Sequence, residues 1–360
     1  MTVALLDGGD HAYPRMLLAL EQARTSIHLE VYAFEPTGIG ATFLTSLTAA
    51  AQRGVQVQVV IDGWGSVLGG NHVAATLRAS GCRVRIHNRL RSVFLGRLTR
   101  NHRKLLLVDD EVAFIGGLNI GDENVSDRVR PGWADLALEL RGPVCVRLGR
   151  RLRRERPGAE VGERSVQVVL AGLGQGWRLR RRYLSLFASA STRIDLAHGY
   201  FLPDRRVLRA LVAAAKRGVQ VELLLSGASD VPFARTATRR LYARLLAAGV
   251  HIHEWRSSVL HAKVCCVDSR AMLLGSFNLD PFSLTNLEVL VAVTDGPVVR
   301  EAQAWVARHL AASHEVTTVE MGGWFERWWF EPLGRLVALL VQAASARVRR
   351  AWRRSSRAER

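Results

Sequence analysis

The chain contains very little lysine: of its 50 lysine and arginine residues, only Lys104, Lys216 and Lys263 are lysine. Two of these three stand two residues after a histidine, in "HRKLLLVD" at 102–109 and in "HAKVCCVD" at 261–268. An ammonium group is a compact point charge, whereas the guanidinium of arginine is a broad planar fork. The two positions therefore predict sites that require a compact cation.

Cysteine and long apolar stretches are also scarce, which excludes several classes of protein. No CxxC spacing occurs, so neither a disulfide framework nor a zinc site is indicated. No apolar run approaches the roughly 18–20 residues that a membrane-spanning helix needs, and the N-terminus lacks the features of a signal peptide. We therefore expect a protein of the reducing cytoplasm, which is peripheral if it works at a membrane. The four cysteines are Cys82, Cys145, Cys265 and Cys266.

Acidic residues are too few to balance the basic ones. The formal net charge of +18 favours a phosphate-rich partner, either nucleic acid or the face of an anionic membrane. An excess of arginine also arises from genomic base composition, so the charge alone does not choose a partner. A chain of 360 residues with 48% hydrophobic and 23% charged residues is typical of a globular protein with two domains.

The two halves of the chain repeat each other. The stretch "AAAQRGVQVQVVIDG" at 49–63 returns as "AAAKRGVQVELLLSG" at 213–227, and the histidine motifs follow in the same order. Each half alternates amphipathic helices with β-branched strands, which predicts an α/β fold of two similar halves, each a mixed β-sheet flanked by helices. We expect a first half at 1–150, a basic linker at 151–165, a second half at 166–316 and a C-terminal tail at 317–360.

Each half carries one copy of the pattern H-x-K-x₄-D-x₆-G-[GS]-x-N, at 102–119 and 261–278. Residues two apart in a strand point to the same face, so each histidine is expected to project together with its lysine. Asp109 and Asp268 stand at hairpin turns, where aspartate bonds the local backbone. We interpret these two aspartates as structural parts of the motif.

The strand that returns from each turn ends in glycine and asparagine. If it pairs antiparallel, Asn119 comes to lie beside His102. In the second copy, Gly275, Ser276 and Asn278 approach the other histidine. Glycine at these positions would let backbone N–H groups come close to an anion.

Two such clusters, brought face to face, would form a phosphate clamp with two histidines. A two-step displacement at phosphorus needs one imidazole that attacks and another that protonates the leaving alcohol and then deprotonates the incoming one. Lysine and asparagine side chains would stabilise the charge that develops on the phosphoryl oxygens. This chemistry requires no metal and no cofactor.

Two carboxylates are candidates for orienting the histidines. A nucleophilic histidine keeps its attacking nitrogen free when a carboxylate bonds the other ring nitrogen. Asp135 in "GWADLALEL" follows the first motif, and Glu288 in "TNLEVLVAV" follows the second. Each opens an apolar strand, so we expect both to lie near the histidines.

The chain resembles the phospholipase D superfamily, whose signature is two copies of HxKxxxxDxxxxxxGSxN. Within it, "RKLLLVDDEVAFIGGLNIGDEN", "WADLALELRGPV", "GSFNLDPFSLTNLEVLVAV" and "YFLPD" are similar to the bacterial cardiolipin synthases of the type without N-terminal membrane helices. The resemblance runs from about Leu5 to about His314. Gly117 departs from the generic motif, which has serine there, and leaves Ser276 as the only motif serine.

The resemblance implies two phospholipase D-like halves related by a pseudo-twofold, one active site between them and a covalent phosphohistidine intermediate. His102 would be the nucleophile and His261 the general acid and base, and the symmetric sequence also allows the reverse. Asp135 and Glu288 would orient the histidines. The groups that would bind the phosphate are Lys104, Lys263, Asn119 and Asn278, with Gly117 and Ser276 beside them.

The reaction implied is transfer of the phosphatidyl group from one phosphatidylglycerol to a hydroxyl of another, which gives cardiolipin and releases glycerol. The same histidine chemistry would serve a phospholipase D-type hydrolase, a phosphatidyltransferase with another alcohol acceptor, or a nuclease or other phosphodiesterase. A membrane-binding scaffold with an inactive site is the alternative outside enzymes, and the two intact motifs argue against it.

The C-terminal tail has its own composition. Residues 320–360 contain four of the nine tryptophans and nine arginines beside a short apolar run, which matches an interfacial anchor on an anionic membrane. A terminal helix packed on the core, with a basic end, is the alternative. A Trp-rich apolar segment favours a phospholipid partner over nucleic acid. We therefore expect peripheral attachment to the cytoplasmic side of the cell membrane, and the sequence predicts no oligomeric state.

Overall fold

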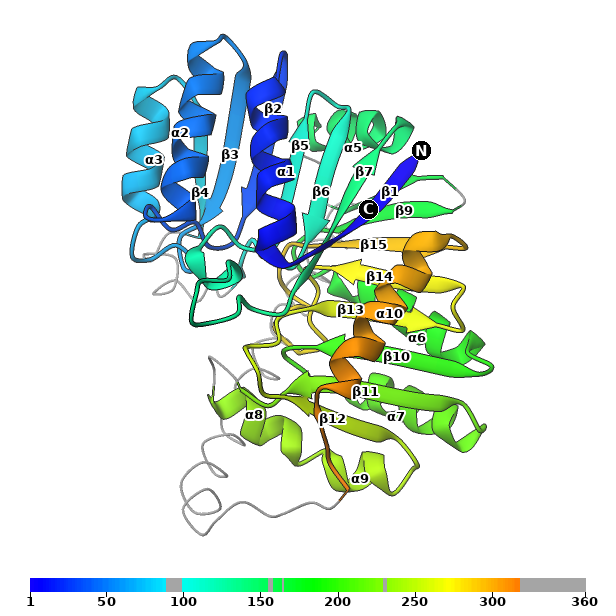
Figure 1. Cartoon of the computed structure of the whole chain (residues 1–360). Helices are drawn as coiled ribbons and strands as arrows, with labels where there is room; N and C mark the ends of the chain where they lie inside the picture. The colour runs from blue at the N-terminus through cyan, green and yellow to red at the C-terminus, as the bar shows by residue number, and fades with distance from the viewer. Residues whose placement is uncertain (89–98, 155–157, 164, 229–231, 318–360) are drawn as a thin grey trace, which may run out of the picture.

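The computed structural model describes residues 1–88, 99–154, 158–163, 165–228 and 232–317. They form two mixed β-sheets, each flanked by helices, and this confirms the predicted α/β fold class (Figure 1). All of the predicted tail except its first residue lies outside the described residues. Among the helices described, none combines the length and the apolar character needed to span a bilayer.

The first sheet has the strand order β1-β7-β6-β5-β2-β3-β4. Strands β2, β3 and β4 run parallel, whereas β5, β6 and β7 form an antiparallel meander. The strands are β1 (Thr2–Asp7), β2 (Ser26–Val31), β3 (Gln56–Asp62), β4 (Arg83–His87), β5 (Leu105–Val108), β6 (Val112–Gly116) and β7 (Leu136–Arg141). The helices are α1 (Gly8–Gln22), α2 (Ile39–Gln52), α3 (Gly70–Ala79), the 3₁₀ helix η1 (Asp122–Asn124) and α5 (Pro143–Arg153).

The second sheet has the order β16-β12-β11-β10-β13-β14-β15-β9-β8 and repeats the same plan. Its strands are β8 (Ala159–Gly162), β9 (Val166–Ala171), β10 (Arg193–His198), β11 (Gln220–Ser226), β12 (His251–Trp255), β13 (Lys263–Val267), β14 (Ala271–Gly275), β15 (Glu288–Thr294) and β16 (His314–Glu315). Its helices are α6 (Gly176–Ser189), α7 (Arg205–Lys216), α8 (Pro232–Arg239), α9 (Tyr242–Leu246) and α10 (Pro297–Ala311).

The Arg-Gly-Val repeat ends a helix and starts a strand in both halves. Gly54 follows α2 with φ +89°, and Gly218 follows α7 with φ +87°. A left-handed residue after a helix favours glycine, because a Cβ atom is strained in that region. The strands that follow, β3 and β11, are exposed only at their first residue and buried over most of their length.

The two sheets share one apolar core, so the halves are not independent layers. This core joins side chains of β5, β6 and β7 to side chains of β9, β13, β14 and β15. Helix α10 belongs to the second half but also contacts the first, since the Trp305 indole donates to the Asp7 carboxylate over 2.6 Å. The stretch 151–165, which we expected to be a linker, holds the end of α5 and strand β8, which pairs with β9.

Candidate active site

The two motifs meet because each crosses to the opposite half just before its strand begins. The His102 N–H donates to the Leu287 carbonyl (2.9 Å), and the His261 N–H donates to the Ala134 carbonyl (2.9 Å). We expected His102 and Lys104 to lie within one strand, but β5 begins only at Leu105. The strand starts late because the backbone around His102 is bonded to the other half.

Each histidine is bonded to the carboxylate of the opposite half. The Nδ1 atom of His261 lies 2.6 Å from Asp135 Oδ2. The Nδ1 atom of His102 lies 3.1 Å from both carboxylate oxygens of Glu288. Each histidine therefore pairs with the carboxylate of the other half and not with the one that follows it in its own half. This pairing leaves the Nε2 atom of each ring for a substrate. Both carboxylates are fully buried.

The His261–Asp135 pair places opposing effects on the imidazole. Burial raises the pKa of Asp135, but the positive charges of His261 and Lys263 outweigh burial and hold that pKa below its usual value. The Leu136 N–H also donates to the Asp135 carboxylate (2.8 Å). Burial and the charge of Lys263 lower the pKa of His261 below its usual value, although Asp135 opposes the decrease. An ionised Asp135 thus stabilises a proton on His261.

The His102–Glu288 pair favours a neutral imidazole. Burial raises the pKa of Glu288 to about 7, although the ammonium of Lys104 opposes the rise. The Ser276 hydroxyl donates to the same carboxylate. Burial, with the charges of Lys104 and Lys263, holds the pKa of His102 well below its usual value. His102 is therefore neutral near pH 7, the form whose nitrogen lone pair can attack.

The two motif lysines are almost completely buried next to the histidines, at 3% and 1% exposure for Lys104 and Lys263. The Lys104 Nζ donates to the His102 carbonyl (3.0 Å), and the Lys263 Nζ donates to the His261 carbonyl. Burial, followed by the charge of Lys263, lowers the pKa of Lys104 to about 7. Two cationic groups thus converge on the space between the histidines.

Gly117 provides room for a carboxylate. A Cβ atom at Gly117 would lie 2.1 Å from Asp135 Oδ1, so the serine of the generic motif would collide with that carboxylate. The Gly117 N–H donates to the Leu136 carbonyl (3.0 Å), and the expected approach of this N–H to an anion is therefore wrong. At the equivalent position of the second half, Ser276 fits and bonds Glu288.

The motif asparagines lie at the same end of the hairpins as the lysines. Strands β5 and β6 pair antiparallel as predicted, and the Gly116 N–H donates to the Lys104 carbonyl (3.3 Å). The Asn119 Oδ1 accepts the Ala33 N–H (3.3 Å). The buried Asn278 Oδ1 has no hydrogen-bond partner among the described residues, which leaves an amide oxygen for a ligand.

The motif aspartates lie at the far ends of the hairpins. Asp109 and Asp268 have φ angles of +54° and +53°. The Asp109 carboxylate accepts the N–H groups of three consecutive residues, Arg24 to Ser26. Asp268 accepts those of Ser191 to Arg193 in the same way. Both tie a hairpin to the strand beside it, in agreement with our interpretation of them as structural parts of the motif.

Sequence reasoning missed several residues around the histidines. The Tyr32 ring centroid lies 5.0 Å from that of His102, and the Tyr200 centroid lies 5.9 Å from that of His261. The repeated segments "EVYAFEP" and "AHGYFLPD" both contain tyrosine, and this signal could have identified the pair. Arg103 was also missed, because it occupies a variable position of the motif.

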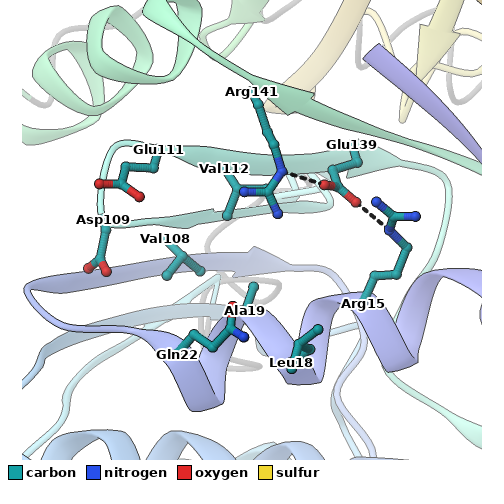
Figure 2. Close-up of a pocket in the computed structure, with 10 residues that line it drawn as sticks. All are labelled: Arg15, Leu18, Ala19, Gln22, Val108, Asp109, Glu111, Val112, Glu139 and Arg141. Atoms are coloured by element: carbon teal, nitrogen blue, oxygen red, sulfur yellow. Dashed lines mark hydrogen bonds and ion pairs between the residues drawn. The ribbon is translucent and has the colours of Figure 1, made fainter. Parts of the chain in front are cut away.

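The described residues also line a cavity of about 270 Å³ between α1 and the strands β5, β6 and β7. Figure 2 shows Glu139 in it, between the guanidinium groups of Arg15 and Arg141. Asp109 lies at its edge and bonds the backbone, as described above. No histidine or lysine lines this cavity, so the paired histidines remain the candidate active site.

Residues 16–129 and 183–310 match the family described as cardiolipin synthase, PLD-like domain. The chain belongs to this family. The two matched segments correspond to the two halves, and each contains one histidine motif, so the predicted family and the predicted repeat are confirmed.

Individual cardiolipin synthases align over most of the chain. Cardiolipin synthase B of Escherichia coli (strain K12) is 33% identical over 322 residues, which cover 81% of this chain and 76% of that protein. The cardiolipin synthase of Geobacillus kaustophilus (strain HTA426) is 34% identical over 308 residues, covering 79% and 61%. The crystal structure of the phosphatidylserine synthase of Haemophilus influenzae Rd KW20 superposes with a TM-score of 0.74 at 14% identity, covering 96% of this chain and 94% of that one. At that identity, the structural likeness shows a shared fold.

Proposed function

We propose that this cardiolipin synthase family member transfers the phosphatidyl group of one phosphatidylglycerol to a hydroxyl of a second, forming cardiolipin and releasing glycerol. Family membership and relatives named cardiolipin synthase, at about 33% identity over most of the chain, support this activity. The observation that carries the mechanism is the crossed pairing of histidines and carboxylates, with one imidazole kept neutral and the other able to hold a proton.

In the first step, His102 attacks phosphorus. Glu288 accepts the Nδ1–H, so the lone pair of Nε2 forms the P–N bond while the P–O bond to the leaving glycerol breaks. His261, protonated and held by Asp135, gives its Nε2 proton to the leaving oxygen. The products of this step are free glycerol, a phosphatidyl group on His102 and a neutral His261.

In the second step, His261 acts as a base. It takes the proton from a glycerol hydroxyl of the second phosphatidylglycerol, and that oxygen attacks phosphorus. The P–N bond breaks, its electron pair returns to His102, and cardiolipin leaves. His261 is protonated again, so the site is restored without any external acid or base.

The lysines and the open amide act on the phosphoryl oxygens. Buried ammonium groups at Lys104 and Lys263 oppose the negative charge that builds up in each displacement, and they do so in a site from which water is largely removed. The unpartnered Asn278 amide oxygen suits a hydroxyl of the substrate glycerol. Transfer requires that the incoming lipid hydroxyl outcompete water at the phosphohistidine.

Membrane attachment is part of the same proposal. The Trp- and Arg-rich composition of residues 317–360 supports peripheral binding to an anionic membrane, and a cytoplasmic protein would meet that membrane from its inner side. The lipid substrate makes such contact necessary, because phosphatidylglycerol resides in bilayers.

The test is incubation of the purified full-length chain with radiolabelled phosphatidylglycerol in mixed micelles, followed by chromatography of the lipids. We expect cardiolipin and glycerol from the wild type and neither from a His102→Ala control. Phosphatidic acid without cardiolipin would instead identify a phospholipase D-type hydrolase. No lipid turnover, together with cleavage of single-stranded DNA or RNA, would overturn the proposal in favour of a nuclease.

A further inference from the structure

An exposed apolar loop follows β3. In residues 63–69, the residues Trp64, Val67 and Leu68 are 41%, 54% and 99% exposed. Leu68 is the extreme case among the described residues, since most large apolar side chains there are buried. An exposed patch of tryptophan, valine and leucine on one short loop is typical of an interaction surface.

The loop is held in place by hydrogen bonds to its backbone. The Asp62 Oδ1 accepts the N–H groups of Trp64 (2.9 Å) and Gly65 (3.2 Å). The Ser66 hydroxyl donates to the Tyr32 carbonyl (3.1 Å). A Cβ atom at Gly65 would lie 2.3 Å from that carbonyl oxygen, so the loop packs closely against the chain below it. These anchors fix the backbone while the apolar tip faces solvent.

The same anchors connect the loop to the active site. The other oxygen of Asp62 accepts the N–H of Asn101 (2.8 Å), the residue before His102. The Arg100 guanidinium carbon lies 5.4 Å from the Trp64 ring centroid and 5.7 Å from that of Phe282, a further exposed aromatic residue. An apolar tip and a cation are thus placed together beside the segment that leads into His102, which we call the mouth of the site.

The second half adds an arginine cluster at the carboxyl ends of its parallel strands. The motif residue Lys263 lies at the same edge of the sheet, where it pairs with His198. Three guanidinium groups surround the single buried carboxylate of Glu254 near the end of β12. The distances are 3.8 Å for Arg235, 2.9 Å for Arg239 and 2.9 Å for Arg256. Three arginines thus gather at this edge around one buried carboxylate.

We propose that the loop at 63–69 inserts into the interface of an anionic phospholipid bilayer, with Arg100 and the arginine cluster at the level of the phosphates. An apolar tip that carries tryptophan, beside arginines, is the side-chain combination that bilayer interfaces favour. A nucleic-acid groove would match the arginines but not a fully exposed leucine. This proposal rests on the proposed function in one respect: a lipid substrate is the reason for the mouth of the site to face a bilayer. The contact of the loop with the bilayer can be measured without turnover.

Buried cysteines make a site-specific test possible. All four native cysteines are free and buried, so a Leu68→Cys variant of the full chain has one accessible thiol for an environment-sensitive dye. A matched control is Leu18→Cys, since Leu18 is 51% exposed on α1, beside the cavity of Figure 2 and away from the histidines. On vesicles of phosphatidylcholine with phosphatidylglycerol, we expect the dye at 68 to shift to the blue and the dye at 18 to stay unchanged.

A second variant measures how much the loop contributes. Leu68→Asp replaces an apolar side chain at the tip, and we expect about tenfold weaker partition onto the same vesicles, with little change for Leu18→Asp. Turnover of short-chain phosphatidylglycerol, present as monomers, should be equal in Leu68→Asp and wild type, because the loop contacts the bilayer and not the reacting atoms.

Several outcomes would overturn the proposal. An unshifted dye at position 68 on vesicles that do bind the chain would assign membrane binding to another part of it, such as residues 318–360. A dye response that depends on protein concentration and not on vesicles would assign the loop to a second copy of the chain. The two proposals can fail separately. If the proposed function is wrong, the wild type turns over no lipid, but the dye at position 68 still reports whether the loop enters the bilayer.

Discussion

The carboxylates of Asp135 and Glu288 are both buried, yet they differ in what surrounds them. Asp135 receives a backbone N–H and faces His261 and Lys263, and its pKa is lowered. At Glu288, burial outweighs the ammonium of Lys104 and the Ser276 hydroxyl, and its pKa is raised to about 7. The pKa of both histidines is lowered, but the ionised Asp135 beside His261 opposes that effect and makes His261 the better placed of the two to take up a proton during the reaction.

The pH dependence of kcat/KM should reflect these two groups. Below about pH 7, the Glu288 carboxylate takes up a proton, so an anion no longer accepts the Nδ1–H of His102. Above about pH 7, Lys104 loses its positive charge. We expect a narrow bell-shaped profile with its maximum near pH 7. In Glu288→Gln, the maximum should fall about 10²-fold and the acidic limb should disappear. An acidic limb that persists in this variant would show that another group causes it.

Lysine should not be replaceable by arginine in the motif. Lys104 is enclosed, with its Nζ 5.1 Å from the Tyr32 ring centroid, and the larger planar guanidinium would displace the phosphate or the ring. Lys104→Arg should lower kcat by about tenfold or more. Lys216→Arg is the matched control, because Lys216 is exposed at the end of α7, and it should retain full turnover. Near-normal kcat for Lys104→Arg would contradict the argument about size.

The hairpins are the elements that fix the positions of the motif residues. Each begins next to a histidine, turns at an aspartate and returns to the glycine and asparagine of the motif. Since each aspartate bonds three successive N–H groups of the segment that leads into β2 or β10, it sets the position of the hairpin against the neighbouring strand. This role concerns stability and placement, because these aspartates lie at the ends remote from the histidines.

Asp268→Asn should therefore destabilise the protein while sparing the chemistry. Asparagine keeps one acceptor oxygen but loses the charge that strengthens these bonds, so we expect about 1–2 kcal/mol less free energy of unfolding, measured by denaturant titration. The kcat of the folded variant should stay within about twofold of the wild type. A large loss of kcat without a loss of stability would instead assign Asp268 a direct part in the reaction.

The repeat, the fold class and the motif residues were predictable from the sequence, because two copies of one local pattern encode two similar hairpins. The carboxylate that pairs with each histidine was not predictable from the sequence. Pairing of His102 with Glu288 depends on backbone contacts between residues 101–102 and Leu287, which join the halves and leave no local signal. The role of Gly117 was hidden for the same reason, since only the folded chain brings Asp135 against it.

At the scale of the whole molecule, the site exists only where the halves meet. The shared core joins both sheets, and Arg103 crosses between them. Its guanidinium donates to the Ala171 carbonyl (2.9 Å) and to the Glu288 carbonyl (3.3 Å) and faces the buried Glu30 (3.4 Å). Burial opposes ionisation of Glu30, but Arg103, together with His28 and Asn101, outweighs it and keeps the pKa of that carboxyl well below its usual value.

Loss of this arginine should weaken the entire fold. Arg103→Met leaves Glu30 buried without its cation, so we expect about 3 kcal/mol less free energy of unfolding. Both halves should unfold in one transition, monitored by circular dichroism and by tryptophan fluorescence. The control is Arg153→Met, which removes a partly exposed surface pair with Asp110 and should change stability by about 0.5 kcal/mol or less. Two separate transitions in the wild type would contradict a shared core.

The covalent intermediate tests the central claim most directly. Wild type, His261→Ala and His102→Ala are each mixed with phosphatidylglycerol labelled in the phosphatidyl group, quenched rapidly in denaturant and digested for mass spectrometry. Our account predicts a phosphatidyl group on the peptide that contains His102 in the wild type and in His261→Ala, and no labelled peptide in His102→Ala. A phosphatidyl group on His261 in the His102→Ala variant, or no covalent adduct in any of the three proteins, would contradict it.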